Sequence, residues 1–167
     1  MRFLSVYLGR EIAGLDKRNI RVKFIGSRDR LPKFVMEKIA RVEQKTGVNT
    51  GLTLVLAINY GSRQEIVSAL KAVAADCVRG ALAIDDVTPD TIDAYLYTAG
   101  LPDPDLLIRT SGEQRLSNFL LWQLSYAELY FTKKYWPDFK KADIVEALEI
   151  YAGRGRRFGG VETKGAT

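Results

Sequence analysis

The sequence has 167 residues, of which 47% are hydrophobic and 27% are charged, with a formal net charge of +5 and no histidine. This length fits one domain that buries about two-thirds of its unfolded surface, and the composition is ordinary for a soluble globular protein. Without histidine, the commonest general base and the commonest metal ligand are excluded, so any catalysis must depend on carboxylates, cations and bound metal.

The positive net charge suits an anionic ligand, an anionic membrane surface or nucleic acid, and composition does not choose among them. A single cysteine, Cys77, excludes an intrachain disulfide. The N-terminus does not resemble a signal peptide, and no apolar run approaches the roughly 18 residues of a membrane-spanning helix. We therefore expect a cytoplasmic protein.

The predicted elements alternate between helix and strand. Apolar residues recur at helical spacing over residues 1–16, and no capping residue precedes them, so we expect the sequence to begin part-way through an element. Residues 21–26 alternate in hydrophobicity and predict a strand. A helix is predicted over 32–46, with Pro32 in its first turn and Gly47 just after its end, which is the usual placement of these two residue types.

A second strand is predicted over 52–58, where a continuous apolar run indicates burial on both faces. It ends at Asn59, before a helix over 62–79. Thr88 then caps a short helix that we expect to end near Gly100. The alternation of strand and helix predicts an α/β fold with a parallel sheet.

The next strand, residues 106–108, ends in a group of polar side chains. Arg109 follows it directly, and Arg115 and Ser117 lie within the same loop. Ligands bind at the carboxyl ends of strands in open α/β sheets. Each guanidinium group can bind two phosphate oxygens at once. We also expect free backbone N–H groups around Gly112, so the loop predicts a diphosphate site. For Arg109 alone, an ordinary surface cation is the simpler interpretation.

The remaining sequence predicts three further elements and a tail. Residues 118–124 are mostly apolar and are interpreted as a buried helical turn or two. A last strand is predicted over 128–131, and Glu128 within it needs a cation or water because an unpaired buried carboxylate is costly. A final amphipathic helix covers 142–152. Residues 154–160 form a basic, glycine-rich tail, for which a solvated end is the simplest interpretation.

Four motifs resemble the cis-prenyltransferase family, in particular the bacterial undecaprenyl diphosphate synthases. They are DLLIRTSGEQRLSNFLLWQLSYAELYF at 105–131, WPDF at 136–139, RRFGG at 156–160 and NYGSRQEI at 59–66. Together with their spacing they cover most of the chain, which makes the resemblance far more specific than one short motif. It implies an α/β fold in which a mostly parallel sheet is flanked by helices.

The resemblance also implies roles for individual residues. Arg109, Arg115 and Ser117 would hold the diphosphate of isopentenyl diphosphate, the acceptor substrate. Glu128 is associated with Mg²⁺ and with the neighbouring subunit's site. Asn59 belongs to a strand-to-helix element beside the cleft, although Asn is also favoured in turns and caps at such positions, so a turn role is the alternative.

At the C-terminus, Arg157, Gly159 and Gly160 match a motif that reaches across a homodimer to the partner's acceptor site. The implied reaction is cis-condensation of isopentenyl diphosphate onto an allylic diphosphate such as farnesyl diphosphate, giving the lipid carrier used in cell-wall synthesis. Arginines and Mg²⁺ would stabilise the charge of the departing diphosphate. The resemblance further implies peripheral membrane contact and no binding of nucleic acid.

Two family segments are absent from the 167 residues: a His-Met-Asp-Gly-Asn-Gly-Arg-Trp-Ala-like loop, which carries the essential aspartate, and a Ser-x-Glu-Asn-Trp-like segment. We therefore expect an N-terminally truncated member, with residues 1–167 forming a single α/β domain that is inactive alone. Ser111 stands where many relatives have glycine. One alternative is a non-catalytic subunit of the same fold. Another is a basic nucleic-acid-binding domain, which would show steep salt dependence, but no RNP, zinc-ligand or helix-turn-helix signature is present.

Overall fold

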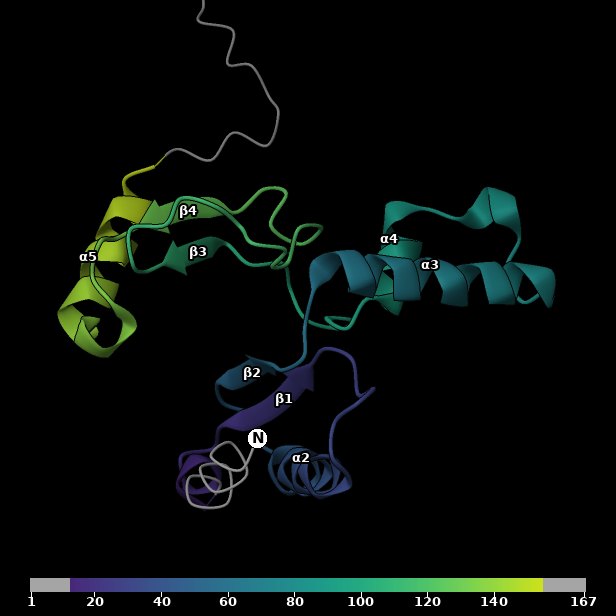
Figure 1. Ribbon diagram of the computed structural model, residues 1–167, viewed down its shortest axis with the longest axis horizontal. Helices are drawn as coiled ribbons and strands as arrows, with labels where there is room; N and C mark the ends of the chain where they lie inside the picture. The colour runs from purple at the N-terminus through teal and green to yellow at the C-terminus, as the bar shows by residue number, and fades with distance from the viewer. Residues whose placement is uncertain (1–12, 155–167) are drawn as a thin grey trace, which may run out of the picture. The chain divides into compact units, whose positions relative to one another are not determined.

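The computed structural model describes residues 13–154 (Figure 1). The chain divides into two compact units, Met1–Gly100 and Leu101–Thr167. Of the helix predicted over 1–16, only the end falls within the described residues, and it is helical over 13–17. The tail predicted over 154–160 lies outside them after Arg154. The single-domain organisation stays a prediction.

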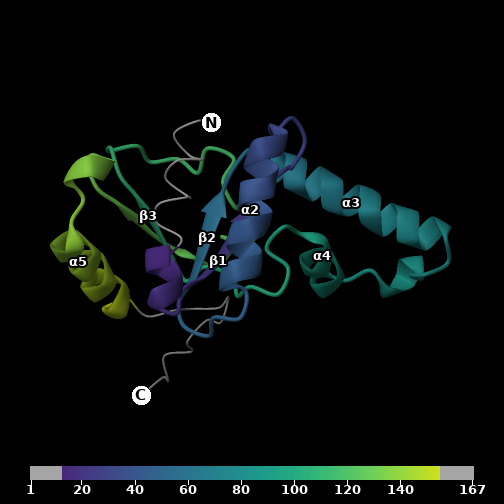
Figure 2. The same ribbon diagram turned by 90° about the horizontal axis from the view of Figure 1, so that it is seen from below.

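The first unit pairs two parallel strands and packs a helix on them. Val22 lies opposite Leu54 in the register of the two strands. Figure 2 shows α2 lying along this small sheet. The elements are β1 (Arg21–Ile25), α2 (Lys33–Thr46), β2 (Thr53–Ala57), α3 (Ser62–Val78), the 3-10 turn η1 (Ile84–Asp86) and α4 (Pro89–Tyr95).

The core of the first unit forms where α2 meets β1. Val35, Ile39 and Val42 are spaced by four and three residues, so they lie on one helix face, and all three are buried against Val22 and Phe24. Burying a side chain such as Ile39 contributes about 1.5–3 kcal/mol. The helix predicted over 32–46 is confirmed, since its apolar spacing, Pro32 and Gly47 together define it.

The outer edge of β1 is closed by side chains of α2. The Val22 N–H donates to Thr46 Oγ1 at 3.0 Å, and the Phe24 N–H donates to Glu43 Oε1 at 2.9 Å. These two N–H groups are the ones that a further strand would need, because alternate residues of a strand point their N–H groups to opposite sides. The helix therefore protects this edge from pairing with another chain.

Two predictions for the first unit need correction. The side chains of β2 are half-buried and Ala57 is exposed, instead of being buried on both faces. The first unit builds only a two-stranded sheet among its described residues, so it covers β2 incompletely. The helix expected to end near Gly100 ends at Tyr95, because Leu96 is extended and the Tyr97 N–H bonds to Glu65 Oε1 at 2.8 Å.

The second unit also contains a parallel strand pair, drawn side by side in Figure 1. Leu106 lies opposite Glu128, and Arg109 lies opposite Phe131. The strands predicted at 106–108 and 128–131 and the final helix are confirmed, with boundaries that differ by at most one residue. The elements are β3 (Leu106–Arg109), β4 (Glu128–Phe131), the 3-10 turn η2 (Trp136–Asp138) and α5 (Lys141–Ala152).

Residues 118–124 form mostly turns, with one helix-like turn where one or two were predicted. Ser117, Asn118 and Leu120 have positive φ angles of 50°, 60° and 46°, which a right-handed helix does not permit. One helix-like turn remains, closed by the Leu124 N–H donating to Leu120 O at 2.9 Å. Leu120 and Leu124 are buried, as predicted. Among residues 13–154, no helix is both long and apolar enough to cross a bilayer.

Candidate functional site

Three of the predicted site residues meet at the carboxyl end of β3. Arg109 Nη1 contacts the carbonyl oxygen of Arg115 and donates to Ser117 Oγ at 3.0 Å. Within the part of the chain that the structure describes, both contacts use this one nitrogen. The Nε and Nη2 groups of the same guanidinium therefore keep their donors for an anion.

The loop after β3 is bent twice through left-handed conformations. Ser111 and Gly112 have φ angles of 70° and 75°, and Ser117 and Asn118 have 50° and 60°. Such angles suit glycine but cost a residue with a side chain on the order of 1 kcal/mol. The bends return the chain to Arg109, so that Arg115 and Ser117 contact its guanidinium.

The backbone N–H groups around Gly112 are not free, contrary to prediction. The Ser111 N–H donates to Lys134 O at 2.7 Å, and the Gly112 N–H donates to Thr132 O at 2.8 Å. The Ser111 hydroxyl donates to Thr110 O at 2.6 Å. The loop thus pairs with the segment that follows β4, which consumes these donors. The N–H groups of Ser111 and Gly112 are therefore not available to an anion, and the side chains of the loop become its main candidate donors.

Arg115 carries the second guanidinium predicted for the site. It forms an ion pair with Glu113, and its side chain is 66% exposed. Exposed ion pairs contribute only about 0–1 kcal/mol, because water screens them. A diphosphate carries more charge than one carboxylate and binds a guanidinium in a bidentate way, so it can compete with Glu113 for Arg115.

Glu128 lies away from this cluster, at the start of β4. Its Oε2 atom is 2.7 Å from Arg154 Nη1, and the same nitrogen donates to Leu129 O at 3.0 Å. The prediction that this carboxylate needs a cation is confirmed, and Arg154 is that cation. Arg154, which follows α5, therefore connects the end of that helix to the first two residues of β4.

The described residues do not by themselves build a magnesium site. Magnesium takes oxygen ligands and is usually held by one or two carboxylates together with substrate phosphates. Among residues 13–154, no group of three or more His, Cys, Asp or Glu side chains is placed to hold a metal. Glu128 offers one carboxylate, which it shares with Arg154. Its role as a magnesium ligand stays a prediction.

Asn59, at the end of β2, holds the loop that follows β1. Its Nδ2 group donates to the carbonyl oxygens of Ser27 and Asp29, both at 3.0 Å, and its own carbonyl accepts from the Ser27 N–H at 3.2 Å. These contacts, with a φ of 51°, support the turn interpretation. Its predicted substrate role is not tested, and Arg157, Gly159 and Gly160 lie outside the described residues.

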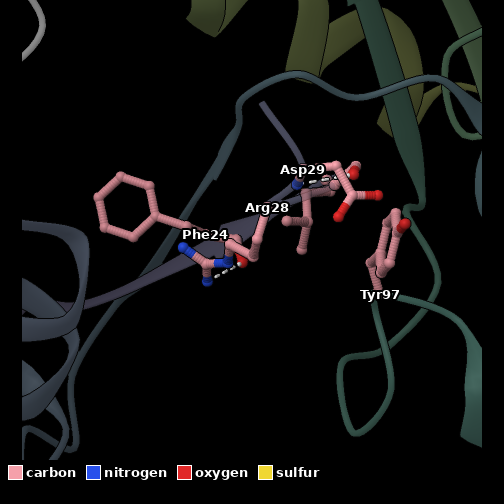
Figure 3. A pocket seen from close by; sticks show the side chains of 7 residues that line it. Phe24, Arg28, Asp29 and Tyr97 are labelled. Carbon is pink, nitrogen blue, oxygen red and sulfur yellow. Dashed lines mark hydrogen bonds between the residues drawn. The ribbon is translucent and has the colours of Figure 1, made fainter. Parts of the chain in front are cut away.

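The loop held by Asn59 forms one wall of a cleft at the carboxyl end of β1. Gly26 is required there, because its φ is 113° and an added Cβ would lie 2.1 Å from Ile58 O. The sequence patterns did not predict this cleft, although the glycine directly after the predicted strand was an indication of it. The cleft has a volume of about 310 Å³ and is lined by Phe24, Ile25, Gly26, Ser27, Arg28, Asp29 and Tyr97 (Figure 3).

Glu65 lies in α3 and is buried, although a glutamate of a surface helix is usually solvated. It is 1% exposed, with Oε2 accepting from Tyr60 Oη at 2.5 Å and Oε1 accepting from the Tyr97 N–H. The rings of Tyr60 and Tyr97 meet edge to face at 6.4 Å. Glu65 thus ties α3 to the residue that lines the cleft. The signal was its position on the buried stripe of α3 that also holds Ser62, Ala69 and Val73.

A parallel strand pair with one arginine at the end of a strand and a second in the loop that follows is typical of an α/β protein that binds an anionic ligand. The family model described as putative undecaprenyl diphosphate synthase matches residues 1–159. The chain belongs to this family, and the resemblance inferred from its motifs is confirmed.

Relatives in the family are closely similar in sequence. The chain is 49% identical over 159 residues to an isoprenyl transferase of Agrobacterium fabrum, covering 95% of this chain and 64% of that protein. It is 48% identical to an isoprenyl transferase of Geobacter sulfurreducens, covering 95% and 65%. The chain therefore spans a little under two thirds of the length of these relatives.

Two solved structures confirm the predicted fold class. One is lavandulyl diphosphate synthase from Lavandula x intermedia in complex with dimethylallyl diphosphate, with a TM-score of 0.92 and 41% identity, covering 96% of this chain and 70% of that one. The other is a probable undecaprenyl diphosphate synthase from Campylobacter jejuni, with a TM-score of 0.82 and 35% identity, covering 95% and 72%.

Proposed function

We propose that this chain provides the acceptor-diphosphate site of a cis-prenyltransferase, which elongates an allylic diphosphate with isopentenyl diphosphate. The observation that carries the proposal is the meeting of Arg109, Arg115 and Ser117 beyond β3. Membership of the family and its isoprenyl transferase relatives support the reaction class.

The same comparisons support the proposed substrates. The Lavandula enzyme was solved with dimethylallyl diphosphate, so an allylic diphosphate is a natural co-substrate for a relative, and we propose farnesyl diphosphate in this case. The family description points to undecaprenyl diphosphate as product, which would serve as a lipid carrier in cell-wall synthesis. Cytoplasmic location and the absence of nucleic-acid binding stay predictions.

In this proposal the residues of the loop bind and orient the acceptor. The guanidinium groups of Arg109 and Arg115 hold the diphosphate oxygens in pairs, and the Ser117 hydroxyl adds a further hydrogen bond. The diphosphate stays on the acceptor throughout, so these contacts hold the acceptor double bond at a fixed distance from the allylic carbon. Such orientation lowers the barrier by converting a bimolecular encounter into a positioned one.

Magnesium is the proposed cofactor and Glu128 its proposed ligand. When bound, the ion would neutralise phosphate charge. Because the described residues offer one carboxylate there, already paired with Arg154, we assign no reaction step to the metal. We also propose that the isolated chain does not elongate prenyl chains, since the aspartate-bearing loop of the family is not among its 167 residues.

A homodimer is the proposed assembly. Ile144, Val145 and Leu148 lie on one face of α5, and all three are exposed. An exposed apolar face of this kind favours an interface, and two-fold symmetry would cover both copies at once. Arg157, Gly159 and Gly160 of each chain would then complete the acceptor site of the other.

Titration calorimetry of the 167-residue chain with isopentenyl diphosphate tests the proposed site. We expect saturable binding that is competed by inorganic diphosphate and weakened by Arg115→Ala, with circular dichroism showing that the variant remains folded. Binding that Arg115→Ala leaves unchanged, or no binding to the folded chain, would reject the proposal.

A further inference from the structure

The segment that follows β4, residues 132–134, holds the loop after β3 in shape. Lys134 O accepts from the Ser111 N–H at 2.7 Å, and Thr132 O accepts from the Gly112 N–H at 2.8 Å. Ser111 has a φ of 70°, which is unfavourable for a residue with a side chain. These two hydrogen bonds oppose that strain, so the shape of the loop depends on the position of residues 132–134.

The first turn of α5 in turn holds this segment. Asp143 is 4% exposed, and its Oδ1 atom pairs with the ammonium group of Lys134. Its Oδ2 atom accepts from the Lys140 N–H at 2.7 Å, which fixes the carboxylate at the start of the helix. A buried carboxylate needs such partners because leaving it unpaired is costly. Contacts therefore run from Asp143 through Lys134 to the Ser111 N–H.

The same loop carries both residues that contact the guanidinium of Arg109. The carbonyl oxygen of Arg115 contacts Arg109 Nη1, and Ser117 Oγ accepts from the same nitrogen at 3.0 Å. A shift of the loop at Ser111 would move Arg115 relative to Arg109. Groups that bind one ligand need supporting residues that hold them in place.

We propose that Asp143 is a positioning residue for the acceptor-diphosphate site, because it holds Lys134 and thereby the loop that carries Arg115. The inference rests on the proposed function, since the site is the one proposed there. Asp143 itself does not contact the diphosphate. Loss of its carboxylate frees the Lys134 side chain, loosens the acceptor of the Ser111 N–H, and lets Arg115 move away from Arg109.

The charge of Asp143 alone would have the opposite effect. Asp143→Asn removes an anion and leaves the Lys134 ammonium group without its counter-charge, so the electric field becomes more favourable for a diphosphate. Asn keeps a side-chain oxygen that can accept from the Lys140 N–H, so the start of α5 retains that hydrogen bond. The sign of the change in affinity therefore distinguishes positioning from charge.

Titration calorimetry of the 167-residue chain with isopentenyl diphosphate tests the inference. Asp143→Asn and Lys134→Met should each weaken binding by about fivefold. Lys141→Met, which removes an exposed ammonium group from the same helix, should bind as the parent does. So should Ala147→Gly, which lowers the stability of α5 at a buried position without touching the ion pair. Urea unfolding of each variant confirms that it is folded under the conditions of the titration.

Two further measurements test the role of the loop. Adding Asp143→Asn to Arg115→Ala should weaken binding by less than about twofold, because the side chain that Asp143 positions is already absent. Deuterium exchange of the Ser111 amide, which needs no ligand, should be faster in Asp143→Asn than in the parent or in Ala147→Gly. Equal exchange in the parent and in Asp143→Asn would contradict the role of Lys134 as the link.

The outcomes separate this inference from the proposed function. If Arg115→Ala weakens binding while Asp143→Asn binds as tightly as the parent or more tightly, the positioning role is rejected and the proposed site stands. Fully additive losses in the double variant would reject that role as well. If the parent does not bind, or Arg115→Ala leaves binding unchanged, the proposed function fails and the role of Asp143 fails with it. If Asp143→Asn does not fold, Lys134→Met decides, and binding equal to that of Lys141→Met would overturn the inference.

Discussion

Arg109 and Glu128 lie at opposite ends of one parallel strand pair. Arg109 is the last residue of β3, opposite Phe131, whereas Glu128 is the first residue of β4, opposite Leu106. Three residues along a strand separate the two levels by about 10 Å. The arginine cluster and the carboxylate that the family resemblance connects with magnesium are therefore distinct features within the second unit.

The first prediction follows from this separation. Glu128→Gln should leave the affinity of the chain for isopentenyl diphosphate unchanged within about twofold, because the side chain lies roughly 10 Å along the strand from Arg109. Calorimetric titration measures the effect directly. A tenfold loss would mean that Glu128 reaches the same diphosphate, and the assignment of two separate features would be wrong.

The second prediction concerns the buried carboxylate of Glu65. Glu65→Ala should lower the free energy of unfolding by about 2–4 kcal/mol, because Tyr60 Oη and the Tyr97 N–H lose their acceptor. Glu65→Gln keeps one acceptor oxygen and should cost less. Urea unfolding followed by circular dichroism provides the measurement, with the exposed Glu37→Ala of α2 as control. Equal stability of Glu65→Ala and Glu37→Ala would contradict the role assigned to Glu65.

The third prediction compares two glycines of left-handed conformation. Gly26→Ala should destabilise the chain by more than 3 kcal/mol, since the backbone is strained and the added Cβ would overlap Ile58 O. Gly80 has a φ of 70° with open space around it, so Gly80→Ala should cost only about 1–2 kcal/mol. Denaturant midpoints of the two variants decide the matter. Similar midpoints would mean that the backbone around Gly26 and Ile58 shifts to accept the added Cβ at little cost in stability.

The fourth prediction is a pH dependence of the second unit. Lys134 and the Lys140 N–H hold the pKa of Asp143 below its usual 3.8, and Asp143 in turn raises the pKa of Lys134 above 10.5. The stabilisation of the fold by the Asp143 carboxylate is fully present above pH 3.8 and is lost as pH falls through its lowered pKa. The stabilisation of the fold by the Lys134 ammonium group is fully present below pH 10.5 and is lost as pH rises through its raised pKa.

Thermal unfolding across pH measures this pair. Asp143→Asn should make the melting temperature depend less on pH at both the acid and the alkaline ends. The single substitution removes the Asp143 carboxylate and, with it, the raised pKa of Lys134. Lys71→Gln, which alters a lysine away from the pair, should leave both sides as in the parent. A variant profile parallel to that of the parent would contradict the pairing.

Sequence patterns predicted most elements because local chemistry and tertiary packing agree there. The helix α2 combines apolar spacing with Pro32 and Gly47, and β3 ends at Arg109, the first polar residue after its apolar run. The same logic placed Arg109, Arg115 and Ser117 in one short loop, and Arg109 does contact the other two there, whereas their binding role stays a prediction.

The errors arose where distant segments decide local structure. Left-handed angles at Ser117 and Leu120 convert an apolar helical pattern into turns. Backbone pairing with Thr132 consumes the donor at Gly112, and Tyr97 from beyond α4 accounts for the burial of Glu65. Neither partner is adjacent in sequence, so spacing did not identify Thr132 or Tyr97, although it did place Glu65 on the buried stripe of α3.

The central claim is that Arg109 and Arg115 act on one diphosphate. A double-mutant cycle with Arg109→Lys and Arg115→Ala, read out as the affinity of the folded chain for isopentenyl diphosphate, tests it most directly. We predict that Arg115→Ala costs about 2 kcal/mol and that the effects of the two substitutions are not additive, because both guanidinium groups share one ligand. The control Arg79→Ala, at the C-cap of α3 where Arg79 pairs with Asp76, should bind as the parent does. Strictly additive effects, or a loss no larger than that of Arg79→Ala, would contradict the claim.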